Sequence, residues 1–242
     1  MTRDAFVLLL ATGVLACGAA PARADDGAIE NVGGAVRLMK GQGHVRMARE
    51  VVRANLSRTR IEVDCVFVME NHGPADTVLV GFPDQSDAGG PGPAMSSFRS
   101  WVDGVEVKCD SMPATTDDPS LETWTRWWTK RVYFAAGATR TIRDHYLAAP
   151  GLTIDGTQMF EYILRTGASW AGTIGSAEVT VSLGDVDSSW VRYVDPKPRV
   201  QGRTLRWTFK DFEPGTSEHS PSSIQVSWWP PEARERWEKG QR

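Results

Sequence analysis

The sequence predicts an all-β protein, an antiparallel β-sandwich. Three observations lead to this prediction: many segments alternate apolar and polar residues one by one, glycine- and proline-containing turns separate them, and helical periodicity is nearly missing. Successive residues of a strand point to opposite faces, so this alternation gives each strand one buried and one solvated face. We favour two packed β modules, residues 28–112 and 120–230, and keep one continuous sandwich as the alternative.

The N-terminus predicts an export signal over residues 1–24. Residues 5–17 are uncharged but shorter than the roughly 18–20 apolar residues that a membrane-spanning helix needs. The Ala-Arg-Ala sequence ending at Ala24 has the pattern that precedes a signal-peptidase site. The sequence ending at Cys17 resembles a bacterial lipobox, which offers lipidation of Cys17 as an alternative. Both routes predict a periplasmic or secreted protein, whose membrane contact would be limited to that N-terminal lipid.

In the first half of the chain, residues 61–69 alternate most regularly and predict a strand. Residues 77–82 predict another, and Asp103-Gly104 predicts a tight hairpin turn, because both residues tolerate positive φ. Residues 44–60 are ambiguous between a helix and a strand. Their arginines suggest an anionic ligand, although a solvated face explains them more simply. These arginines are Arg46, Arg49, Arg53, Arg58 and Arg60.

In the second half, residues 159–183 predict a central hairpin with a glycine-rich connection. Phe160, Tyr162 and Leu164 share one face of its first arm, and Val179, Val181 and Leu183 share one face of the second. Residues 123–137 and 138–151 predict a pair of strands joined by a turn at 136–138. Gln201-Gly202 predicts a turn that leads into a strand at residues 204–212, and residues 222–229 predict a further strand. The tail at 231–242 predicts a short helix or a disordered end.

The two cysteines beyond the export signal, Cys65 and Cys109, both lie on apolar strand faces. Exported proteins are often oxidised, so we expect a disulfide between them and keep two buried free thiols as the alternative. Neither cysteine has the electropositive surroundings of a catalytic thiol.

Charge and motifs exclude several classes of function. The chain has 27 Lys and Arg against 30 Asp and Glu, a net charge of −3, so it lacks the basic excess of a nucleic-acid-binding protein. It contains no G-x-S-x-G, no H-E-x-x-H and no P-loop, and its four histidines lack metal-ligand spacing. We therefore predict no catalytic residue, no cofactor and no metal.

The 10 tryptophans are the unusual feature of the composition. Trp207 and Trp228 lie on apolar strand faces and belong to the predicted core. Trp127, Trp170 and Trp229 lie in a loop or on opposite faces, where exposed rings could stack on sugars or anchor a protein partner. The alternative is that packing covers these faces as well.

Several landmarks together resemble a known family. They are EVVRANL, EVDCVFVMENHG followed by TVLVGFP, FRSWVDGVEV, YILRTGASWAGTIGSAEVTV, and LRWTFKDFEP before IQVSWWP. This order is similar to the secreted bacterial proteins of the family domain of unknown function 4424. The first half also resembles the β module that opens inter-α-trypsin-inhibitor-type proteins. The resemblance implies an exported β protein without assigned chemistry, and it supplies no catalytic residues.

We therefore expect a non-catalytic exported cell-envelope protein with a binding or structural role, whose partner would be an envelope protein or a polysaccharide. A carbohydrate-binding module that uses Trp127, Trp170 and Trp229 is the alternative, and a hydrolase is the less favoured one.

Overall fold

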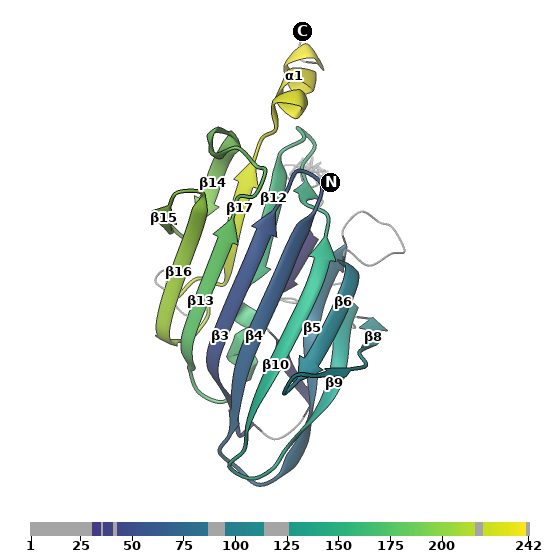
Figure 1. Ribbon diagram of the computed structural model, residues 1–242, viewed down its shortest axis with the longest axis vertical. Coiled ribbons are helices and arrows are strands. Elements are labelled where there is room, and N and C mark those ends of the chain that lie inside the picture. The colour runs from purple at the N-terminus through teal and green to yellow at the C-terminus, as the bar shows by residue number, and fades with distance from the viewer. Residues whose placement is uncertain are drawn as a thin grey trace, which may run out of the picture.

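The computed structural model describes residues 31–34, 36–40, 43–86, 95–113, 126–215 and 220–240. Over these residues the chain forms two β-sheets packed face to face, with helix α1 (Pro231–Gly240) beyond one end of the strands (Figure 1). The predicted all-β sandwich is confirmed. The predicted export signal, including Cys17, lies outside the described residues.

The sheet that faces the viewer in Figure 1 has eight strands. Its order is β15 (Arg199–Gln201), β16 (Thr204–Phe212), β13 (Ile174–Ser182), β3 (Val45–Leu56), β4 (Ile61–Asn71), β10 (Thr139–Ala148), β6 (Met95–Val102) and β7 (Val105–Val107).

The second sheet has nine strands. Its main order is β14 (Val191–Asp195), β17 (Ser223–Trp228), β12 (Gln158–Ile163), β1 (Asn31–Gly34), β5 (Asp76–Ser86), β9 (Arg126–Phe134) and β8 (Asp110–Pro113). In addition, β11 (Gly151–Leu152) pairs with β12, and β2 (Arg37–Lys40) pairs with β5. Most strand pairs are antiparallel, as predicted. The pairs β3–β13 and β1–β12 are parallel, so both sheets are mixed.

Strand β4 shows the predicted alternation in full. Ile61, Val63 and Cys65 are at most 1% exposed, whereas Glu62 and Asp64 between them reach solvent. Apolar side chains at every second position thus line the space between the sheets, as the sequence pattern requires.

The ambiguous residues 44–60 contain strand β3, and a β-bulge explains the ambiguity. The register of β3 against β4 shifts between Met47 and Arg49. Before the bulge Met47 points into the core, and after it Glu50 and Val52 do, so the inward positions change from odd to even numbers. The extra residue at the bulge therefore gives the buried positions of this segment a spacing that resembles that of a helix. It also points the side chain of Glu50 into the interior.

Two of the predicted turns form hairpins. Asp103 and Gly104 have φ of 50° and 81° and join β6 to β7, as predicted. The predicted turn at Gln201-Gly202 joins β15 to β16.

Two other predicted hairpins are wrong for one shared reason. Strands β12 and β13 lie in opposite sheets, and so do β9 and β10. Each of these strands has one apolar face, and placing the two faces across the sandwich buries both of them. Alternation specifies which face of a strand is buried, but it does not specify whether the next strand lies beside it or opposite it.

The sheets are not divided between the two predicted modules. Strand β10 lies between β4 and β6, and β13 lies beside β3, so the eight-stranded sheet mixes strands from 28–112 and 120–230. A single cluster of buried side chains runs between the two sheets. The continuous sandwich, the alternative in the sequence analysis, describes this arrangement.

The tail forms helix α1, one of the two predicted outcomes. Its Ala233 packs against Gly156, where an added Cβ would lie 2.7 Å from the Cβ of Ala233, so this contact requires a glycine. In the part of the chain that the structure describes, no helix is long and apolar enough to cross a membrane.

Candidate functional site

Two of the three tryptophans predicted to be exposed are buried. Trp127 is 4% exposed because it lies against Gly81 of β5 and under the guanidinium group of Arg37, 5.9 Å from the ring centroid. Trp170 is also 4% exposed, and its Nε1 donates a 2.7 Å hydrogen bond to the carbonyl oxygen of Val36. Neither ring face is free to stack on a sugar, so the predicted exposure of Trp127 and Trp170 is wrong.

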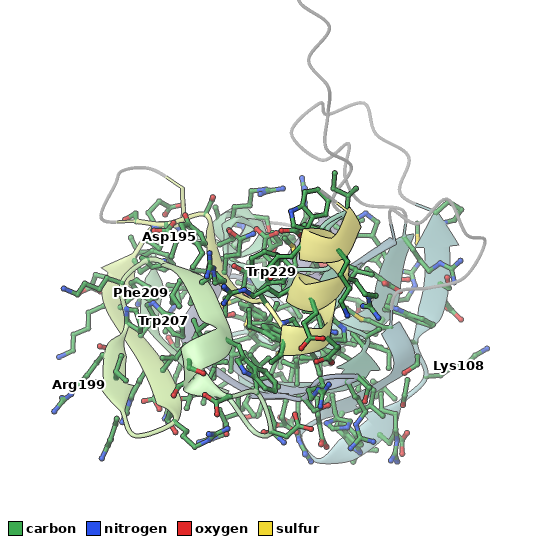
Figure 2. All side chains as sticks on the ribbon, turned by 90° about the horizontal axis from the view of Figure 1, so that it is seen from above. Lys108, Asp195, Arg199, Trp207, Phe209 and Trp229 are labelled. Carbon is green, nitrogen blue, oxygen red and sulfur yellow. The ribbon has the colours of Figure 1, made fainter. Side chains whose placement is uncertain are left out.

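Trp229 is half-buried beside α1 (Figure 2). Its Nε1 donates a 3.1 Å hydrogen bond to the carbonyl oxygen of Asp155, and the Cζ atoms of Arg192 and Arg234 lie 5.3 and 6.0 Å from the ring centroid. These contacts hold the start of the helix against the sheet. Because Trp127 and Trp170 are buried, the three tryptophans do not form the ligand-binding surface that was expected of them.

We expect Trp170→Phe to lower the free energy of unfolding by about 1–3 kcal/mol, because the buried carbonyl of Val36 would lose its partner. Urea unfolding measures this change. Trp237→Phe, on the exposed side of α1, is the matched control and should unfold like the wild type. A Trp170→Phe protein as stable as the wild type would speak against this core role.

Cys65 and Cys109 are both free thiols, so the structure does not contain the predicted disulfide. Cys65 is buried in β4, and Cys109 is half-buried just after β7. Burial raises the pKa of both thiols, that of Cys109 to about 11. Both are therefore protonated at neutral pH, which is the unreactive form of a thiol.

The interior holds charged groups that the sequence analysis missed. Lys130 of β9 and Asp144 of β10 face each other across the sandwich, with Nζ 2.6 and 2.7 Å from the two carboxylate oxygens and the side chains 1% and 0% exposed. In the same way, the hydroxyl of Tyr162 in β12 donates a 2.8 Å hydrogen bond to Oε1 of Glu50 in β3. These pairs connect the sheets, and all four side chains are buried.

The outer face of the eight-stranded sheet carries two adjoining hollows of about 360 and 440 Å³. Both are lined by Thr180 and Thr204, which point outward because their neighbours Val181 and Leu205 point into the core. We call these hollows together the outer groove. Besides these two threonines, its polar lining residues are Arg53, Asn55, Glu62, Asp64, Arg143, His145 and Ser182 in the first hollow and Arg199, Gln201, Arg206 and Thr208 in the second.

One part of the outer groove is already occupied by internal ion pairs. Arg143 holds the carboxylate of Asp64 through Nη2 and through Nε at 2.9 Å, and this hydrogen bond raises the pKa of Arg143. Nδ1 of His145 lies 3.6 Å from the same carboxylate, and its Nε2 lies 3.8 Å from Glu62. In the described part of the chain, these acidic and histidine side chains do not form a metal-binding group.

Other polar side chains of the outer groove are available for hydrogen bonds to a ligand. Within the described residues, those of Asn55, Thr180, Thr204 and Thr208 form no hydrogen bond to the rest of the protein. They present hydroxyl and amide groups that can both donate and accept hydrogen bonds. The outer groove therefore suits a ligand rich in hydroxyl groups.

From the sequence, none of these threonines was expected in a site. Among the residues of the outer groove, only two were considered: Arg53, as one of the arginines of 44–60, and His145, as one of the four histidines without metal-ligand spacing. The alternation does place Thr180 on a solvated face opposite Val179 and Val181. Which strands lie beside β13, and therefore which side chains surround Thr180, depends on sheet order and register.

No protein-family model and no curated protein matches the chain. Among solved structures it is similar to a Legionella pneumophila subsp. pneumophila str. Philadelphia 1 protein described as a "putative nutrient binding protein", with 17% identity and a TM-score of 0.68 over 87% of this chain and 74% of that one. At this identity the similarity shows the fold alone.

Two enzymes give weaker similarities. The M1 zinc metallopeptidase from Deinococcus radiodurans has 12% identity and a TM-score of 0.38, over 78% of this chain and 43% of that one. Native leukotriene A4 hydrolase from Saccharomyces cerevisiae has 11% identity and a TM-score of 0.42, over 76% of this chain and 29% of that one. The chain thus spans less than half the length of each enzyme, and neither similarity supports an argument about function.

Proposed function

We propose that this protein is an exported, non-catalytic binding protein that holds a hydroxyl-rich ligand, such as an oligosaccharide, in the outer groove. The observation that carries the proposal is the pair of adjoining hollows. Four side chains that line them form no hydrogen bond within the described residues: Thr180, Thr204, Thr208 and Asn55. The Legionella protein is described as a nutrient binding protein, which agrees with a binding role. The export signal expected at residues 1–24 would bring the protein to envelope polysaccharides.

The proposal assigns no chemical step to the groove. Asp64, the carboxylate nearest to His145, is held by Arg143 and is not free to act as a base. Cys65 and Cys109 carry raised pKa values, so they do not supply a thiolate nucleophile.

We expect the mature protein, residues 25–242, to bind members of an array of neutral and acidic oligosaccharides. Thr180→Tyr, which fills the junction of the two hollows, should weaken that binding at least about tenfold. Thr77→Tyr is the matched control, since Thr77 is exposed on β5 of the other sheet. Binding that survives Thr180→Tyr unchanged would place the ligand elsewhere, and no binding anywhere on the array would remove the proposal.

A further inference from the structure

Two arginines at one edge of the outer groove face each other directly. Arg199 of β15 is the cross-strand partner of Arg206 of β16, and both line the second hollow. Like charges placed directly opposite each other in a sheet are destabilising. Nη2 of Arg206 lies 2.7 Å from the carboxylate of Glu178, but Arg199 has no ion pair within the described residues. Figure 2 shows Arg199 pointing away from the body of the protein.

A third arginine lies in the same row across the sheet. Arg206 pairs with Thr180, and Thr180 pairs with Arg53, so Arg53 lies two strands, roughly 10 Å, from Arg206. On its other side Arg53 faces Asp64, whose carboxylate is held by Arg143. Arg53 therefore also has no ion pair of its own within the described residues.

This arginine row, Arg199–Arg206–Arg53, is a local feature of a chain with a net charge of −3. The row thus concentrates positive charge on a protein that is acidic as a whole, which favours selective over general attraction of anions. Guanidinium groups bind carboxylate, sulfate and phosphate oxygens in a two-point geometry. Around the row, Thr180, Thr204 and Gln201 add hydrogen-bonding groups that a bare inorganic anion would not use.

We propose that the outer groove recognises an acidic oligosaccharide whose anionic groups bind Arg53 and the Arg199–Arg206 pair, while its hydroxyl groups bind the threonines between them. This inference rests on the proposed function and adds the charge of the ligand to it. The ligand would relieve the repulsion between Arg199 and Arg206 when it binds.

The test compares three probes by isothermal titration calorimetry: oligogalacturonate, its neutral methyl ester, and heparin oligosaccharides as a sulfated glycan. We expect at least one acidic glycan to bind at least 100-fold more tightly than the methyl ester, and we expect this preference to weaken as salt is raised. Arg53→Gln and Arg199→Gln should each weaken acidic-glycan binding at least tenfold. Arg131→Gln, at an exposed position of β9 on the other sheet, should bind like the wild type.

The inference would be overturned if the acidic glycan and its ester bound equally well, or if both acidic glycans failed to bind. Binding that stayed unchanged in Arg53→Gln and Arg199→Gln would also overturn it. Tighter binding of a single-stranded oligonucleotide or of inorganic phosphate than of either glycan would also overturn it. If these results overturn the charge preference but a neutral glycan still binds, and Thr180→Tyr abolishes that binding, the proposed function remains intact. Melting temperatures check that the variants fold, and Arg199→Gln should not lower this temperature because it removes a like-charge contact.

Discussion

Asp144→Ala should lower the free energy of unfolding by about 3–5 kcal/mol, the usual cost of removing one partner of a buried ion pair. Asp144 is 0% exposed, and its two oxygens lie 2.6 and 2.7 Å from Nζ of Lys130, which is 1% exposed. Without the carboxylate, the ammonium group of Lys130 would be left charged and unpaired between the sheets. Urea unfolding, with the slope checked for two-state behaviour, measures the loss.

Two further variants test whether the loss comes from the unpaired charge. The double variant Lys130→Met with Asp144→Leu removes both charges, and it should recover most or all of the wild-type stability. The exposed pair Arg99–Glu106, with side chains 54% and 49% exposed, provides the comparison, and Glu106→Ala should leave the urea midpoint close to the wild-type value. A double variant no more stable than Asp144→Ala would show that shape, and not charge, dominates at this position.

Glu50→Gln should make the protein more stable at pH 8 and leave it unchanged near pH 4. Burial raises the pKa of Glu50 to about 7, although the hydrogen bond from Tyr162 opposes the rise. The folded state thus keeps its proton over a pH range in which the unfolded carboxyl has lost it, so the wild type loses stability as the pH rises from about 4.5 to about 7. Above pH 7 the full penalty, about 3 kcal/mol for this shift, is present.

The glutamine variant retains an oxygen that can accept the Tyr162 hydrogen bond, but it has no charge to bury. Oε2 of Glu50 has no hydrogen-bond partner within the described residues, so an ionised carboxylate has little to compensate its burial there. Urea unfolding of both proteins at several values between pH 4 and pH 8 isolates this group, because every other titrating residue is shared. A stability difference that does not change with pH would contradict the raised pKa of Glu50.

Some features of this fold were predictable because they depend on neighbouring residues. The alternation in residues 61–69 predicted β4 and its buried face, and Asp103-Gly104 predicted the turn between β6 and β7. In contrast, the strands that surround a given segment depend on contacts far along the chain. This is why the predicted pairing of β12 with β13 failed even though Phe160, Tyr162, Val179 and Val181 are all buried as expected.

The residues of the candidate site depend even more on contacts between distant parts of the chain. Trp127 was predicted on the correct side of its strand, but Arg37 and Gly81 cover it, and no local pattern indicates that cover. Glu50 points inward because a bulge shifts β3 by one residue. Arg53 and Arg199 are far apart in sequence, and the register of four adjacent strands brings them into one row.

By itself, then, the sequence determined that this chain forms strands with one buried face, since that property follows from side chains alternating about a local backbone. The tertiary structure decided which strands lie side by side, which tryptophans are covered and which arginines share the outer groove. Those outcomes depend on burying all the apolar faces together, and that is a property of the whole chain.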